Sequence, residues 1–132
     1  MAVRGIRGAT VVTEDRTEVV SAATRELLLA MMEANPTLQA ADIASAFFTV
    51  TEDIRSAHPA KAARELGWDQ VPMLCAREIP VPGSLPLCIR VLLNWNTELP
   101  QHAVRHVYLG QAASLRPDLS PTDTRALNNG AC

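Results

Sequence analysis

The chain is organised around the stretch Cys88-Ile89-Arg90-Val91-Leu92-Leu93-Asn94-Trp95-Asn96, where β-branched and aromatic residues alternate as they do in a strand. One face of this strand carries four apolar side chains, those of Ile89, Val91, Leu93 and Trp95. Arg90 lies on the other face, where a buried guanidinium without an anionic partner would cost on the order of several kcal/mol. Arg90 is therefore expected to meet either a carboxylate of this chain, in a structural ion pair, or an anionic ligand.

The overall composition indicates one globular domain without a strong electrostatic field. The chain has 132 residues, of which 48% are hydrophobic, and its formal net charge is −2. Such a charge provides no field for nucleic acid or for an anionic membrane surface. Lys61 is the single lysine among 12 basic residues, and the others are arginines, which bind carboxylates and phosphates in a bidentate manner. For the exposed arginines, a bias in codon usage is the simpler explanation.

The sequence predicts neither secretion, nor a membrane span, nor a metal site. Residues 1–7 contain no apolar core of signal-peptide length, and no run approaches the roughly 18 to 20 apolar residues of a membrane span. The cysteines are odd in number and have no CxxC spacing: Cys75, Cys88 and Cys132. They are expected to be reduced thiols in the cytoplasm. The histidines form no ligand-type group with cysteine: His58, His102 and His106.

The remaining periodicity predicts four more strands, one long helix and several short helical turns. The strands are expected over residues 3–12, 43–50, 71–75 and 105–109. The long helix is expected to begin at Asp15, with Thr17 as an alternative cap, and to run to about Glu33, before Asn35-Pro36. Shorter helical turns are expected over residues 37–41, 60–66 and 111–115.

These elements predict an α+β domain, in which a five-stranded mixed β-sheet packs on one long helix and short helical turns. The helix has one core-facing stripe, formed by Val20, Ala23, Leu27, Met31 and Ala34. A sheet this small, with apolar residues on both faces, is expected to cover its second face with another subunit. Residues 1–119 are interpreted as the single domain, and the polar residues 120–132 as a flexible tail.

Basic side chains in two segments are candidates for a ligand site. Arg7 lies between Gly5 and Gly8, and glycine in a strand often marks the close approach of another group, so ligand contact is favoured for Arg7. Lys61 and Arg64 share one face of a short helix. That face is interpreted as solvated, with a cationic rim over an acidic ligand as the alternative.

Three further side chains have both a structural and a functional interpretation. Glu78 could be a solvated loop residue or the ion-pair partner of Arg90, or it could belong to a site. The structural interpretation of Cys75 is a small buried thiol, and that of Tyr108 is a half-buried aromatic residue of a strand.

The chain contains six characteristic segments, in the order Arg4-Gly5-Ile6-Arg7-Gly8-Ala9-Thr10, Pro59-Ala60-Lys61-Ala62-Ala63-Arg64, Cys75 with Glu78, Cys88-Ile89-Arg90-Val91, Val104-Arg105-His106-Val107-Tyr108-Leu109 and Leu115-Arg116-Pro117-Asp118-Leu119. Together they resemble the monofunctional, trimeric chorismate mutases of the small α/β type found in bacteria. The resemblance covers about residues 3 to 119. Each segment is weak alone, but six in register are hard to reach by chance.

The resemblance implies a homotrimer of five-stranded subunits, a pseudo-α/β-barrel, with three active sites at the subunit interfaces. It implies the rearrangement of chorismate to prephenate, on the route to phenylalanine and tyrosine, without a cofactor or metal. This Claisen rearrangement needs no nucleophile, acid or base, in agreement with a sequence that has no Ser/His/Asp constellation and no phosphate loop. Holding the substrate in a reactive geometry and stabilising developing charge are the two effects left for the protein.

By the same resemblance, the matching positions receive roles as site residues. Arg90 would face the ether oxygen of chorismate, and Glu78 with Cys75 would contact the region of the ring hydroxyl. Arg7 and Tyr108 would hold a substrate carboxylate.

Further substrate-binding roles follow for the entrance of the site. Arg64 and Arg116 would lie at this entrance, with Leu115 beside Arg116 on a C-terminal segment that closes over the ligand. His58 is a departure from the pattern, because the position before Pro59 is usually a phenylalanine that packs over the ligand. Two alternatives stay open. The first is a trimeric imine/enamine deaminase, which the N-terminal Arg-Gly-Ile-Arg-Gly-Ala-Thr stretch argues against. The second is a non-catalytic trimer that senses a small acid.

Overall fold

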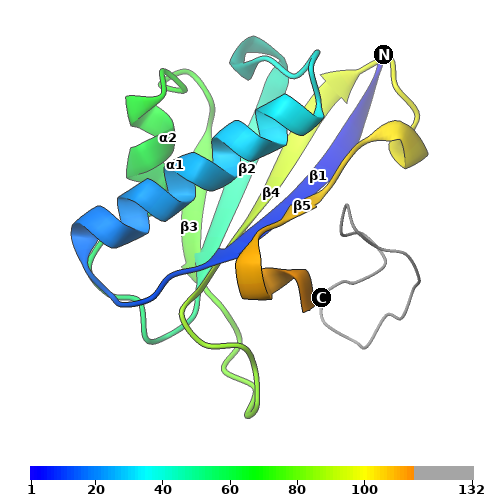
Figure 1. Ribbon diagram of the computed structural model, residues 1–132. Helices are drawn as coiled ribbons and strands as arrows, with labels where there is room; N and C mark the ends of the chain where they lie inside the picture. The colour runs from blue at the N-terminus through cyan, green and yellow to red at the C-terminus, as the bar shows by residue number, and fades with distance from the viewer. Residues whose placement is uncertain (115–132) are drawn as a thin grey trace.

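The computed structural model describes residues 1–114, which form a five-stranded sheet with one long helix across one face (Figure 1). The strands are β1 (Ala2–Val11), β2 (Ile43–Val50), β3 (Met73–Arg77), β4 (Cys88–Thr97) and β5 (Val107–Tyr108). The helices are α1 (Thr17–Ala34) and α2 (Ala60–Glu65), and the 3₁₀ turns are η1 (Ala40–Asp42), η2 (Gln101–Ala103) and η3 (Gly110–Ser114). The predicted α+β class is therefore confirmed. The predicted domain end at residue 119 and the predicted tail lie outside the described residues.

The alternation along residues 88–96 predicted a strand, and this strand, β4, is the central one of the sheet. The strand order is β3-β2-β4-β1-β5. β4 pairs antiparallel with both β1 and β2, whereas the β1–β5 and β2–β3 pairs are parallel, so the sheet is mixed. β3 lies at an edge, which agrees with Pro72 immediately before it, because proline cannot donate to a strand ladder.

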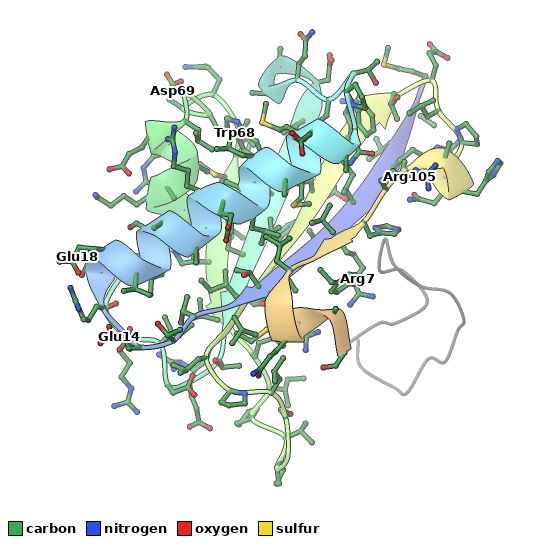
Figure 2. All side chains as sticks on the ribbon, viewed as in Figure 1. Arg7, Glu14, Glu18, Trp68, Asp69 and Arg105 are labelled. Carbon is green, nitrogen blue, oxygen red and sulfur yellow. The ribbon has the colours of Figure 1, made fainter. Side chains whose placement is uncertain are left out.

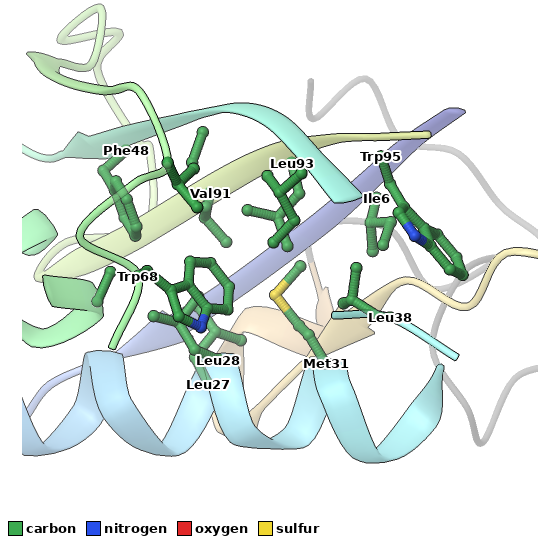
Figure 3. Close-up of a cluster of buried hydrophobic side chains, with 14 of the residues drawn as sticks. Ile6, Leu27, Leu28, Met31, Leu38, Phe48, Trp68, Val91, Leu93 and Trp95 are labelled. Atoms are coloured by element: carbon green, nitrogen blue, oxygen red, sulfur yellow. The ribbon is translucent and has the colours of Figure 1, made fainter. Parts of the chain in front are cut away.

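α1 packs its apolar side against one face of the sheet and forms the main core (Figure 3). Its buried residues are Val20, Thr24, Leu27, Leu28 and Met31. The predicted stripe is right at three of these positions, whereas Ala23 and Ala34 are only partly buried. A Cβ added at Gly8 would collide with the sulfur of Met31, so the absence of a side chain on β1 lets the helix approach closely. Within residues 1–114, no helix is both long and apolar enough to cross a membrane.

Tertiary contacts determine the first turn of α1, and the predicted capping is wrong. The N-cap residue is Arg16, and its side chain makes no capping hydrogen bond. The Asp15 carboxylate instead accepts the backbone N–H groups of Arg55 and Ser56, each at 3.0 Å. The Thr17 hydroxyl donates to the carbonyl oxygen of Ser56 at 3.1 Å. Both predicted caps are therefore used to attach the loop before α2 to the start of α1.

Asn35 ends α1, as predicted, and also anchors a distant segment. Its Nδ2 donates to the carbonyl oxygens of Met31 and Arg105, both at 2.9 Å. Its Oδ1 accepts the backbone N–H of Arg105 at 2.9 Å. One buried amide side chain thus satisfies both backbone groups of Arg105.

β5 is shorter than the predicted strand over residues 105–109, because side chains replace backbone pairing before Val107. Only Val107 and Tyr108 pair with β1. Arg7 lies immediately before this ladder along β1, and its backbone N–H donates to Nδ1 of His106 at 2.9 Å. An imidazole nitrogen therefore occupies a place that a strand carbonyl would otherwise fill.

The face of the sheet away from α1 carries a row of exposed apolar side chains. Leu92 pairs with Phe47, and Phe47 pairs with Leu74. These side chains are 39%, 42% and 65% exposed, respectively. Arg7 continues the row as the other neighbour of Leu92. A contiguous apolar row on a surface marks an interaction site, so the subunit contact predicted from the sequence remains the expectation for this face.

Candidate active site

Four residues on neighbouring strands share one row of the sheet, on the face away from α1. Arg90 of β4 is the register partner of Ala9 in β1 and of Thr49 in β2. Ala9 is in turn paired with Tyr108 in β5. Because directly paired residues point to the same face of a sheet, these side chains lie side by side. The small Ala9 leaves space between the larger side chains of Tyr108 and Arg90.

Glu78 meets Arg90 beside this row, so the ion pair considered from the sequence is present. Nε of Arg90 lies 3.3 Å from Oε2 of Glu78, and the two side chains are 21% and 18% exposed. The Thr49 hydroxyl donates to the same carboxylate oxygen. The backbone N–H of Glu78 donates to the carbonyl oxygen of Val50 at 2.9 Å, which extends the pairing beyond β3. The guanidinium and the carboxylate are therefore oriented before any ligand binds.

Arg7 and Tyr108 contribute to the wall of the same cavity. The guanidinium carbon of Arg7 lies 5.9 Å from the centre of the Tyr108 ring, within the range of a cation–π contact. Figure 2 shows Arg7 close to β5. The cavity has a volume of about 280 Å³ and is lined by Arg7, Gly8, Phe47, Thr49, Glu78, Arg90, Val91, Leu92 and Tyr108. Two guanidinium groups and one carboxylate suit a ligand that has anionic groups and a hydroxyl group.

Cys88 is a buried thiol at the start of β4, two residues before Arg90. Burial raises the pKa of this thiol, although the charge of Arg90 acts in the opposite direction. A thiol with a raised pKa stays protonated at neutral pH and is a poor nucleophile. Cys88 is therefore interpreted as a structural thiol of the core.

Two of the predicted site residues, His58 and Cys75, line a different cavity. This second cavity has a volume of about 350 Å³ and also exposes Arg77. Cys75 pairs with Phe48, whose buried ring belongs to the core beneath α1. Cys75 therefore points to the opposite face of the sheet from Arg90. Within one chain, the structure does not bring His58 and Cys75 to the first cavity.

The remaining predicted site residues lie apart from both cavities or beyond the described range. Arg64 is exposed on α2 and lines neither cavity. Its neighbour Lys61 forms an exposed ion pair with Glu65, in which Nζ lies 2.9 Å from Oε2, as expected for a solvated helix face. Leu115 and Arg116 lie outside the described residues.

A junction at the start of β4 orients the strand that carries Arg90. Leu87 has a φ of 52°, and it is the one non-glycine residue with positive φ in the described part of the chain. Both carboxylate oxygens of Asp53 accept its N–H at 3.1 Å. The Thr51 hydroxyl donates to Asp53 at 2.6 Å and accepts the N–H of Cys88 at 2.9 Å. These bonds stabilise a backbone conformation that L-residues rarely adopt.

Sequence reasoning missed Thr49 and this junction. Thr49 has the composition of an ordinary strand residue, and only the strand register shows that it neighbours Arg90. The polar run Thr51-Glu52-Asp53 immediately after an apolar strand was the available signal for the junction. Among residues 1–114, no group of three or more His, Cys, Asp or Glu side chains is arranged to hold a metal ion.

Comparisons with known proteins find similarity to chorismate mutases. Residues 3–119 match the family described as chorismate mutase type I. The chain is 61% identical over 117 residues to chorismate mutase AroH of Thermus thermophilus, covering 89% of this chain and 96% of that protein. It is 44% identical over 128 residues to chorismate mutase AroH of Bacillus subtilis strain 168, covering 96% and 100%. A solved chorismate mutase from Clostridium thermocellum superposes with a TM-score of 0.81 at 44% identity, covering 83% of this chain and 97% of that one.

Proposed function

The chain belongs to the chorismate mutase type I family and converts chorismate to prephenate in aromatic amino acid biosynthesis, and we propose that it does so in the cavity where Arg90 meets Glu78. The observation that carries this proposal is the ion pair of these two residues, 3.3 Å apart, in a cavity that also exposes Arg7 and Tyr108. The family assignment favours this function over the deaminase and over the non-catalytic acid sensor.

Chorismate rearranges within a single molecule, so the protein has to supply geometry and charge. One carbon–oxygen bond of the ether breaks while one carbon–carbon bond forms, and no proton or external electron is exchanged. Because bond breaking runs ahead of bond formation, negative charge grows on the ether oxygen in the transition state. A fixed cation beside that oxygen binds the transition state more tightly than it binds the substrate.

Arg90 is the residue proposed for that position. It lies on the central strand rather than on a loop, and its neighbours in the sheet on either side are Ala9 and Thr49. Its ion pair with Glu78 fixes the guanidinium at the cavity wall. A preorganised donor of this kind needs no reorganisation when the charge develops, which is the reason such groups are effective.

Glu78 is proposed to accept a hydrogen bond from the ring hydroxyl of chorismate. Its carboxylate is held by the Thr49 hydroxyl and by Arg90, which leaves its position well defined. A carboxylate near the ring also tolerates the positive character that the ring gains as the ether bond weakens. In the same site, Glu78 balances the charge of Arg90 when no substrate is bound.

Arg7 and Tyr108 are proposed to bind a substrate carboxylate. The two side chains lie close together, with the guanidinium carbon 5.9 Å from the ring centre. A guanidinium can hold a carboxylate through two parallel, charge-assisted hydrogen bonds, and a phenol can add a third. Clamping the carboxylate restricts the flexible arm of chorismate to a reactive, folded conformation.

We further infer a cytoplasmic homotrimer in which a neighbouring subunit completes each site. His58 and Cys75 line a cavity separate from that of Arg90, and Arg64 is exposed on α2, so a ligand would need these residues from another chain. The exposed row formed by Phe47, Leu74 and Leu92 is the surface proposed to contact that subunit. By family resemblance, Leu115 and Arg116 would close over the bound ligand, and no cofactor is required.

Mixing experiments with two inactive variants test this arrangement. Arg90→Ala and Arg64→Ala subunits are refolded together, and the loss of chorismate is followed by its ultraviolet absorbance. If each site uses Arg90 of one subunit and Arg64 of another, about one quarter of the sites in randomly mixed trimers are intact, and activity returns. A matched mixture of Arg90→Ala with Glu78→Gln should stay inactive, because both residues lie on one wall. Absence of recovery in the first mixture would exclude a site shared between Arg90 of one subunit and Arg64 of another.

A further inference from the structure

We propose that His106 is a positioning residue that holds Arg7 in place for the carboxylate of chorismate, an inference that rests on the role proposed above for Arg7. The backbone N–H of Arg7 donates to Nδ1 of His106 at 2.9 Å, and the two residues are 99 positions apart in the sequence. His106 does not line the cavity, so it acts through Arg7 rather than on the substrate.

The contact determines which imidazole nitrogen carries the proton. A backbone amide can only donate, so Nδ1 of His106 must accept and cannot hold a hydrogen. The neutral ring therefore has its proton on Nε2. The hydrogen bond selects one of the two tautomers, and it requires the uncharged form of the ring.

The imidazole compensates for backbone pairing that the sheet lacks at this edge. The β1–β5 ladder has only two pairs, Gly8 with Val107 and Ala9 with Tyr108. Residues 105 and 106 precede this ladder, and at this position the Arg7 amide donates to the His106 ring. A strand edge whose amides are not bonded is free to fluctuate, and Arg7 would move with it.

A second side chain attaches the same edge in the same way. The amide of Gln101 accepts the N–H of Gly5 at 3.0 Å and donates to the carbonyl oxygen of Gly5 at 2.7 Å. Side chains of the segment before β5 thus hold alternate residues of β1, Gly5 by Gln101 and Arg7 by His106. Glycine permits more backbone conformations than other residues, so the Gln101 bonds limit movement at Gly5, before Arg7, while the strand pair with Val107 limits it at Gly8, after Arg7.

His106 also fixes the position of Arg7 relative to Tyr108, the other residue proposed to bind the substrate carboxylate. Tyr108 follows His106 by two residues, and its ring lies 5.9 Å from the Arg7 guanidinium carbon. A hydrogen bond from Arg7 to His106 therefore fixes how far Arg7 lies from Tyr108 along the strand direction. Loss of this bond should weaken binding of the substrate carboxylate. Because this carboxylate is present in both the substrate and the transition state, the loss should raise KM and leave kcat little changed.

Steady-state kinetics of two variants test the proposal. In His106→Asn, Oδ1 is attached to Cγ as Nδ1 is in histidine, so the acceptor is retained; His106→Leu has a similarly branched side chain without an acceptor. We expect His106→Leu to raise KM for chorismate roughly two- to tenfold, the range of one lost hydrogen bond, with kcat little changed. His106→Asn should keep KM near the wild-type value. His102→Leu, at an exposed histidine of η2, is the matched control and should change neither constant.

Equal values of KM in the two His106 variants, or an equal fall of kcat in both, would overturn the proposal. A purely structural role would lower the thermal midpoint without separating KM from kcat. A measurement on the wild-type protein does not depend on whether a variant folds: the nitrogen chemical shifts of the His106 ring should show the Nε2–H tautomer, and the Arg7 amide should exchange slowly. An Nδ1–H tautomer would refute the contact.

Arg7→Ala separates failure of this inference from failure of the proposed function. If Arg7 binds a carboxylate, Arg7→Ala raises KM by more than His106→Leu does. If Arg7→Ala leaves KM unchanged while the tautomer is as expected, the role of Arg7 in binding is wrong and the proposal falls with it. If Arg7→Ala raises KM but His106→Leu does not, only the positioning role is refuted.

Discussion

Replacing Arg90 by alanine is expected to lower kcat about 10²- to 10³-fold, with a smaller effect on KM. The loss of one preorganised donor to a developing oxyanion typically removes about 2.7 to 4 kcal/mol of transition-state stabilisation. We place the effect toward the upper end of this range, because Glu78 lies 3.3 Å away and both side chains are largely shielded from water. In the variant, the Glu78 carboxylate would remain in the cavity without its cation, and its charge would disfavour the negative charge that grows on the ether oxygen.

The assay is the decrease of chorismate absorbance, with the product confirmed by its acid-catalysed conversion to phenylpyruvate. Arg25→Ala, at an exposed arginine of α1 that lines neither cavity, is the matched control and should retain wild-type constants. Adding Glu78→Gln to Arg90→Ala should recover part of kcat, because the repulsive charge is removed. A kcat within about tenfold of wild type, together with a raised KM, would show that Arg90 binds the ground state and not the transition state.

Two further predictions concern groups that act around this pair. Thr49→Val keeps the shape of the side chain but removes the hydroxyl that donates to Glu78, so we expect kcat/KM to fall roughly two- to tenfold. Thr49→Ser keeps the hydroxyl and should retain most activity. Equal losses of kcat/KM in the two variants would contradict a role for the hydroxyl. Hydrogen bonding by Ser56 and by the backbone of Arg55 holds the pKa of the Asp15 carboxyl below its ordinary value. The Asp15 carboxylate therefore stabilises the folded protein at any pH above that ordinary pKa. This stabilisation is lost as the pH falls through the lowered pKa. Urea unfolding of wild type and Asp15→Ala should therefore differ at neutral pH and converge in acid, and a difference independent of pH would refute this linkage.

The strand over residues 88–96 could be predicted from the sequence because burial on one face leaves a simple alternation. Ile89, Val91, Leu93 and Trp95 are all buried, and Arg90 lies on the opposite face with its carboxylate partner. Such alternation depends only on local backbone geometry, which residue identities report directly.

Features that depend on long-range contacts could not be predicted in this way. Asp15 had the spacing of a helix cap, but its carboxylate binds a loop 40 residues further along the chain. Cys75 could be named as a site residue, yet the β2–β3 register that turns it toward α1 is invisible in the sequence. The start of the predicted fifth strand was wrong because the Asn35 amide takes the backbone groups of Arg105, a contact that spans 70 positions.

The two-residue strand β5 has a consequence for how the enzyme is made. Arg7 is synthesised 99 positions before His106, and still earlier relative to Tyr108, the two residues with which it interacts. Arg90, Glu78 and Thr49 have all been synthesised before then, so a nascent chain can assemble its charge-stabilising wall while the carboxylate clamp is still incomplete. Because Arg7 of β1 meets Tyr108 only after β5 has been synthesised, ribosome-bound chains halted after β4 should have no high affinity for chorismate.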